Sequence, residues 1–168
     1  MRIASFDPAS VRNLGWTILN FNNNKISDCK AGTFVIEKKE NVWQACWPIF
    51  VFVEDFLTKT KPDLVICEKT SSFAGSFITG QVSNCMGVIF ACCGKLNLDI
   101  KFVYPTHVKK VVCGKGKCSK SEMQKAVIGM LGKIEIENNT SHAYDAISNI
   151  ICYLIDEKNY IPKERKNK

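Results

Sequence analysis

The feature that most constrains the fold is an apolar run with no polar alternation, Leu64-Val65-Ile66-Cys67, which ends in Glu68. Strands that helices cover on both faces have this kind of sequence, whereas a strand with one wet face alternates apolar and polar residues. The run therefore predicts a strand over 63–68 inside an α/β sheet. A second buried strand is expected over 99–103.

The remaining elements predict a mixed sheet flanked by helices. The pattern favours strands over 3–7, 14–21 and 31–36, joined by short polar turns. Helices are expected over 41–59, over 81–96, from Pro105, from the capping sequence Ser119–Glu122, and from Thr140 or Ser141 to about Glu157. Three strands followed by strands that alternate with helices indicate a five-stranded mixed α/β sheet, antiparallel first and then parallel. Pro48 is expected to bend the first helix or to delay its start.

Length and composition fit one domain. The chain has 168 residues, and its 46% hydrophobic content excludes a disordered chain. We expect a single domain over 1–160 and a basic tail over 161–168. Neither a signal peptide nor an apolar run of the roughly 20 residues that a membrane helix needs is predicted. A cytoplasmic protein without a membrane partner is therefore expected.

The chain contains nine cysteines, an odd number. Several fall within apolar periods, where a free thiol behaves as a small hydrophobe. Cys113 and Cys118 lie close together, but no second Cys/His pair follows at zinc-finger spacing. We expect reduced and mostly buried thiols, rather than disulfides or structural zinc.

Much of the formal net charge of +7 lies between Ile100 and Ser121. This stretch has no acidic residue and contains Lys101, Lys109, Lys110, Lys115, Lys117 and Lys120. A basic stripe suggests a polyanionic partner. On charge alone, a solvated and solubilising surface explains it equally well.

Three carboxylates occupy positions that suit a site. Asp7 and Glu68 end predicted strands, and Asp145 lies early in the last helix, one turn after His142. Taken singly, each fits a structural role, such as a turn before Pro8, a lysine partner or a capping network. Taken together, they offer several ligands to a hard divalent cation. Two cations about 3.5–4 Å apart can activate water and stabilise the leaving oxygen of a phosphodiester.

Four motifs in order resemble the RuvC-type Holliday junction resolvases. They cover 1–155, with insertions around 42–60, and the chain looks most similar to the poxvirus resolvases of that family. The opening motif covers 3–10 and Leu14-Gly15-Trp16, and the second, acidic motif is Cys67-Glu68. The third, basic motif covers Val108–Val112, Gly114-Lys115-Gly116 and Ser119-Lys120, and the last, acidic motif covers His142–Ala146. Ala9 replaces the usual Gly of the first motif, and His142 stands where many members carry an Asp.

The resemblance implies a ribonuclease H–like fold and a homodimer that makes paired nicks in four-way and other branched DNA. It implies two Mg²⁺ ions per active site, held by Asp7, Glu68, His142 and Asp145, and a nitrogen ligand would also favour Mn²⁺. Lys109 and Lys120 match family lysines near the scissile phosphate, and so join the expected catalytic set. DNA contacts are expected from Lys109, Lys110, Lys115, Lys117, Lys120 and Phe73. Phe77 and a core role for Phe73 are the alternatives for the aromatic position.

The helix over 82–96 is the expected dimer interface, and packing against its own sheet is the alternative. Two other functions remain open at the level of sequence. One is a ribonuclease H–like nuclease that acts on RNA–DNA hybrids or RNA. The other is a branched-DNA-binding module without catalysis.

Overall fold

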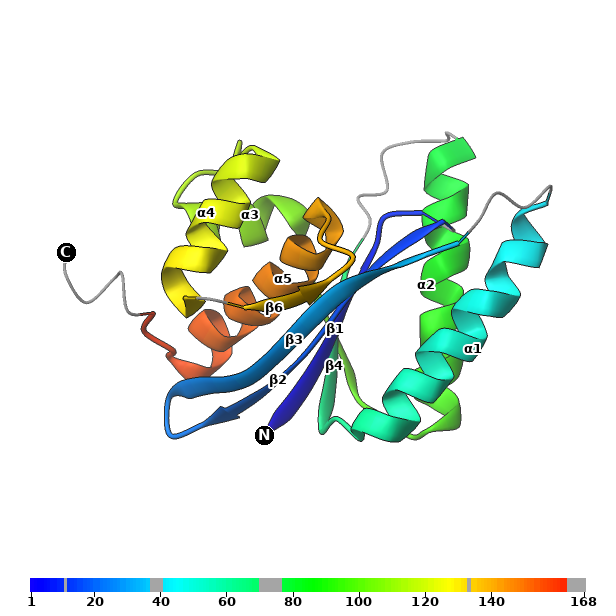
Figure 1. The fold of residues 1–168 in the computed structure, drawn as a ribbon, viewed down its shortest axis with the longest axis horizontal. Coiled ribbons are helices and arrows are strands. Elements are labelled where there is room, and N and C mark those ends of the chain that lie inside the picture. The colour runs from blue at the N-terminus through cyan, green and yellow to red at the C-terminus, as the bar shows by residue number, and fades with distance from the viewer. Residues whose placement is uncertain (11, 37–40, 70–76, 133, 163–168) are drawn as a thin grey trace.

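The structure is a computed structural model that describes residues 1–168 except 11, 37–40, 70–76, 133 and 163–168 (Figure 1). Among the described residues, no helix combines the length and the apolarity needed to cross a bilayer. Most of the predicted basic tail lies outside the described residues. The division into one domain and a tail stays a prediction.

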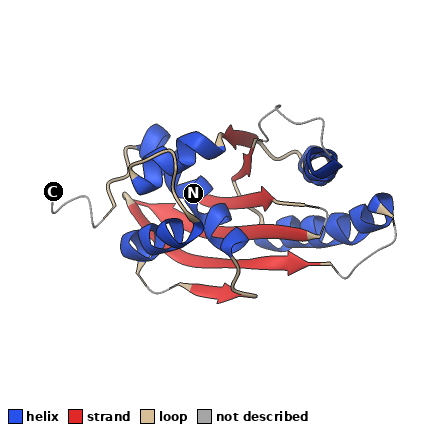
Figure 2. Cartoon of the chain, turned by 90° about the horizontal axis from the view of Figure 1, so that it is seen from above, coloured by secondary structure: helices blue, strands red, loops and turns tan. Residues whose placement is uncertain are grey.

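The strands form one mixed sheet with the order β5-β4-β1-β2-β3-β6. Figure 2 shows them side by side. Their bounds are β1 Arg2–Pro8, β2 Asn13–Asn22, β3 Lys25–Val35, β4 Leu64–Glu68, β5 Ile100–Val103 and β6 Glu135–Glu137. β1, β2 and β3 form an antiparallel meander, whereas β4 runs parallel to β1, β5 to β4 and β6 to β3.

The predicted five strands are all present, but the prediction missed β6 on the edge beside β3. β6 has only three residues, and both of its glutamates are exposed. A strand so short has too little alternation to be recognised in a sequence. The turn between β2 and β3 was predicted correctly, and Asn23 and Asn24 both adopt positive φ there, as tight hairpin turns require.

In the described part of the chain, five helices cover the sheet, with α1 and α2 on one face and α3, α4 and α5 on the other (Figure 1). Their bounds are α1 Val42–Thr60, α2 Phe77–Lys95, α3 Pro105–Cys113, α4 Lys120–Leu131 and α5 Ser141–Lys158. α1 includes Pro48 and begins at Val42, so of the two effects predicted for Pro48, a bend or a late start, the late start is excluded. The Asn41 N–H donates to Gln44 Oε1 at 3.3 Å, which stabilises the start of this helix ahead of the proline.

Each face of the sheet has its own apolar core, and β1 contributes to both. Ile3 packs in the core under α5, whereas Ala4 and Phe6 pack in the core under α1 and α2. Because strand side chains alternate between faces, Asp7 lies on the α5 face. In β4, Ile66 packs in the core under α5 and Cys67 in the core under α1 and α2. The next residue, Glu68, therefore lies on the α5 face as well.

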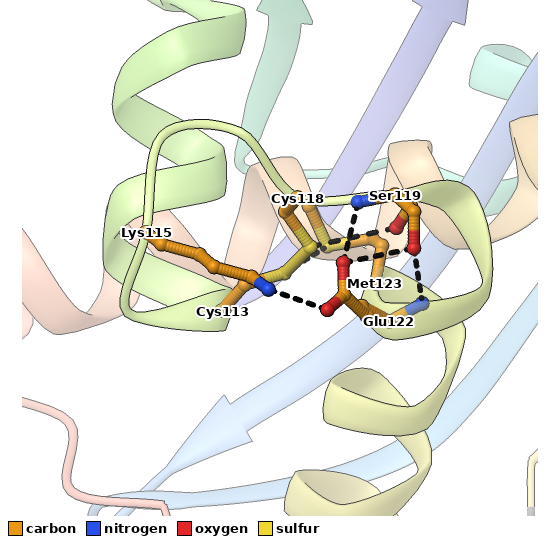
Figure 3. Close-up of a disulfide and its surroundings, with 6 residues drawn as sticks. All are labelled: Cys113, Lys115, Cys118, Ser119, Glu122 and Met123. Atoms are coloured by element: carbon orange, nitrogen blue, oxygen red, sulfur yellow. Dashed lines mark hydrogen bonds and ion pairs between the residues drawn. A yellow bond between two sulfur atoms is a disulfide. The ribbon is translucent and has the colours of Figure 1, made fainter.

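The expectation of reduced thiols is wrong for one pair. Cys113 and Cys118 form a disulfide, with their Cα atoms 6.3 Å apart (Figure 3). Gly114 has a φ of 79° and turns the chain back directly after α3, so that the short loop returns Cys118 to Cys113. The other seven cysteines are free, and five of them are buried as expected.

Candidate active site

Three of the predicted ligands meet where the end of β1 lies against the first turn of α5. Asp7, His142 and Asp145 each place one ligand atom within 4.8 Å of the others. His142 Nδ1 lies 2.9 Å from Asp7 Oδ2. Asp7 is buried, at 7% exposure, whereas His142 and Asp145 are half-buried. The site is therefore a largely enclosed group of nitrogen and oxygen donors.

Gly15 allows α5 to approach the sheet this closely. Gly15 pairs with Asp7 across the β1–β2 ladder. A Cβ atom at this position would lie 2.1 Å from the carbonyl oxygen of His142, which is not sterically possible. The sequence motif included Gly15 but gave it no role. A glycine inside a strand often marks the close approach of another backbone.

Hydrogen bonds tie the start of α5 to the sheet. Thr140 caps the helix by accepting from the His142 N–H at 3.2 Å, and its hydroxyl lies 2.6 Å from that of Thr33 in β3. One turn after Asp145, the buried Asn149 amide donates to the Phe6 carbonyl at 3.4 Å. These contacts fix α5 beside the strand end that carries Asp7.

Glu68 lies beside this group, although it is not among the three residues whose ligand atoms cluster within 4.8 Å. β1 and β4 are parallel, with Phe6 opposite Cys67, so the next residues, Asp7 and Glu68, are neighbours on the same face. Burial, followed by the charges of Asp7 and Asp145, raises the pKa of Glu68 to about 8. Burial and the charge of Asp7 raise the pKa of Asp145 to about 6.

Glu68 and Asp145, whose pKa values are raised by burial and then by the charge of neighbouring acids, suit a divalent cation. A cation would offset both the burial and the mutual repulsion that now disfavour the charged forms. Carboxylate oxygens with one imidazole are ligands that Mg²⁺ or Mn²⁺ accepts. The residues present therefore fit the cofactor that the sequence predicts.

Two of the predicted lysines lie near these acids. The charge of Lys109 on α3 partly offsets the rise in the pKa of both Glu68 and Asp145, and the charge of Lys120 partly offsets the rise in the pKa of Asp145. Lys120 Nζ also donates to Ser141 Oγ at 2.8 Å, at the start of α5. The basic stripe thus reaches the carboxylates from α3 and α4.

The other predicted DNA contacts lie further along the stripe. Lys110, Lys115 and Lys117 are exposed. Lys115 is paired with Glu122, the residue that completes the cap of α4 with Ser119 (Figure 3). This pairing reduces the charge that Lys115 offers to a polyanion. Phe73 and the side chain of Phe77 lie outside the described residues.

Comparisons with known proteins agree in one family. The family model described as crossover junction endodeoxyribonuclease RuvC matches residues 3–153. The enzyme of that name from Prochlorococcus marinus is 31% identical over 130 residues, which cover 76% of this chain and 80% of the relative. The one from Rickettsia akari is 26% identical over 148 residues, covering 88% of this chain and 93% of the relative.

Solved structures share the fold. Thermus thermophilus RuvC in complex with a Holliday junction substrate has a TM-score of 0.79 at 20% identity, covering 99% of this chain and 96% of that chain. The Fowlpox virus resolvase in complex with Holliday junction DNA has a TM-score of 0.58 at 17% identity, covering 92% and 99%. The expected ribonuclease H–like fold is confirmed. The narrower likeness to poxvirus resolvases stays a prediction, since the bacterial fold superimposes better than the viral one.

Proposed function

The chain belongs to the RuvC family of crossover junction endodeoxyribonucleases, and from this membership we propose that it is a Holliday junction resolvase that nicks four-way DNA at the site around Asp7. The observation that carries the proposal is the meeting of Asp7, His142 and Asp145 between β1 and α5, with Glu68 beside them. A structural role for each acid taken singly does not explain why they converge on one partly buried point.

We propose that Asp7, Glu68, His142 and Asp145 hold two Mg²⁺ ions, with Mn²⁺ as a substitute. When bound, such ions neutralise charge on the phosphodiester and make water a better nucleophile. Asp7 is the central ligand, since it lies against His142 and influences the pKa of both Glu68 and Asp145. The imidazole of His142 must be neutral to bind, and its contact with Asp7 orients the ring.

The lysines act on the substrate. Lys109 and Lys120 lie beside the carboxylates, and they stabilise negative charge as it develops on the scissile phosphate. Lys110 and Lys117 contact backbone phosphates further along, which contributes affinity without sequence selectivity. Binding of junction DNA should therefore weaken steeply as salt rises.

The decisive experiment uses Asp7→Asn and Asp145→Asn on a synthetic four-way junction with Mg²⁺ or Mn²⁺. Each variant should lose cleavage while still binding the junction, because the amide keeps the shape but not the charge that holds the ions. Asp55→Asn, on the exposed face of α1, is the matched control and should cleave normally. Retained cleavage in either site variant contradicts the assignment of the metal ligands. Faster cleavage of an RNA–DNA hybrid duplex than of the junction contradicts the proposal that branched DNA is the substrate.

Paired nicks need two active sites, and we propose that a homodimer supplies them through the outer face of α2. The predicted apolar stripe of this helix is already used within the chain, since Cys85, Ile89 and Cys92 are buried in its own core. The opposite face is exposed and carries small residues with Phe90 beside them, and a Cβ at Gly80, Gly87 or Gly94 would meet no atom within 4 Å. Such a face lets a second helix approach closely.

A further inference from the structure

A second group of metal-ligating side chains lies where α3 packs against α5, away from the active site. His107 belongs to α3, and Cys152 and Asp156 belong to α5. His107 Nε2 lies 2.8 Å from Asp156 Oδ2, and the same oxygen lies 3.5 Å from Cys152 Sγ. All three ligand atoms are within 4.8 Å of one another. The nitrogen, sulfur and oxygen donors thus converge on one point.

The position of this group on α5 separates it from the catalytic carboxylates. Cys152 follows Asp145 by seven residues, which is about 10 Å along a helix. Cys152 and Asp156 are four residues apart and so share one face of α5. His107 and Asp156 are partly exposed, with 51% and 37% of their side-chain surface accessible, whereas Cys152 is buried. The thiol therefore forms the floor of the group, and the two exposed ligands leave a path for an ion to enter.

The donor set selects a different ion from that of the active site. Mg²⁺ prefers oxygen ligands and has little affinity for a thiolate, whereas Zn²⁺ binds Cys, His and Asp together. Tetrahedral zinc with its usual bond lengths needs a sulfur–oxygen distance of about 3.6 Å and a nitrogen–oxygen distance of about 3.3 Å. The observed 3.5 Å already fits the first distance, and the observed 2.8 Å must open by about 0.5 Å.

We propose that His107, Cys152 and Asp156 form a zinc site, with the fourth position open to water. On binding, the Cys152 thiol releases its proton to solvent and a zinc–sulfur bond forms, while the ion replaces the direct contact between His107 and Asp156. The ion would join α3 to α5. Since His107 lies two residues before Lys109, the site would hold the lysine-bearing helix against the helix that carries Asp145.

Cobalt is the probe of choice because a thiolate ligand gives Co²⁺ a charge-transfer band that oxygen and nitrogen ligands do not. The full chain, stripped with EDTA and kept with its disulfide intact, is titrated with Co²⁺ in excess Mg²⁺. We expect one equivalent of thiolate-bound cobalt, which one equivalent of Zn²⁺ displaces. Cys152→Ser should abolish the band, and His107→Gln should weaken cobalt binding by about tenfold or more, the lower end of what even outer-shell changes cost.

Cys29→Ser, at a half-buried free thiol on β3, is the matched control and should keep the band. Cys113→Ser with Cys118→Ser should keep it as well, which excludes the disulfide pair as the ligand. Absence of the band in the wild type, or its persistence in Cys152→Ser, overturns the proposal. If Cys152→Ser fails to fold, His107→Gln decides the question, because His107 is exposed. Unchanged cobalt affinity in His107→Gln also overturns the proposal.

Discussion

Gly15 lies opposite Asp7 in the β1–β2 ladder, where any side chain would meet the backbone of His142. Gly15→Ala must therefore push the first turn of α5 away from the sheet and separate the ligands. We expect a loss of stability of about 1–3 kcal/mol from overpacking. We also expect cleavage of a four-way junction to fall by about 100-fold, the effect of a 1 Å misplacement.

Thr58→Ala is the control for this change, because Thr58 is exposed on α1, away from the site and from the outer face of α2, and alanine favours a helix. Its stability should be equal or slightly higher. Urea denaturation and a single-turnover cleavage assay measure both effects. Wild-type cleavage in Gly15→Ala would show that α5 does not need this close approach.

Glu68 makes the stability of the metal-free protein depend on pH. Its pKa rises from 4.5 to about 8 on folding, so between these values the folded chain holds a proton that the unfolded chain has released. The free energy of unfolding therefore falls as pH rises through this window, and the contribution of the protonated carboxyl is lost above about pH 8. Asp145, whose pKa rises from 3.8 to about 6, adds a similar fall at lower pH.

Glu68→Gln should remove the decrease in the free energy of unfolding between about pH 6 and 8. The decrease that Asp145 causes at lower pH should remain. Urea denaturation in EDTA across this range measures the slope. The exposed Glu135→Gln on β6 should leave the slope unchanged. An unaltered slope in Glu68→Gln would mean that folding does not raise the pKa of Glu68.

At the scale of elements, the loop between α3 and α4 combines the disulfide with Lys115 (Figure 3) and Lys117 of the basic stripe. Closing so short a loop stabilises the fold by about 2 kcal/mol, or about 4–8 °C in Tm for a chain of this size. A reductant should lower the Tm of the wild type by that amount. It should have no effect on the variant that combines Cys113→Ser and Cys118→Ser, and equal Tm values for the wild type in both conditions would contradict a stabilising bond.

Most element types were predictable because each has a local cause. The capping box of Ser119 and Glu122, the N-cap of Thr140 and the buried run of β4 are all present in the structure. The errors lie where local signals are weak. β6 exists because β3 offers a free edge, and the disulfide exists because Gly114 reverses the chain; neither cause is visible in the spacing of residues.

At the scale of the whole molecule, the proposed dimer forms through the exposed outer face of α2. Gly87→Glu places a long charged side chain there, at a position where an added Cβ would meet no atom within 4 Å. We expect light scattering to change from twice 18.9 kDa to 18.9 kDa. A glutamate introduced at an exposed position of α4 by Lys125→Glu should leave the dimer intact. A wild-type monomer, or a dimeric Gly87→Glu, would rule out this interface.

The sequence by itself determined the family, the α/β order and the candidate ligands, because acids at strand ends and in four ordered motifs are local patterns. It left each acid with an ordinary structural alternative. Only the tertiary structure decided that Asp7, His142 and Asp145 converge, since this depends on β1 lying beside β2 and on Gly15 letting α5 settle on the sheet. The raised pKa values of Glu68 and Asp145 also depend on the tertiary structure, because burial and the approach of like charges arise only when distant segments pack together.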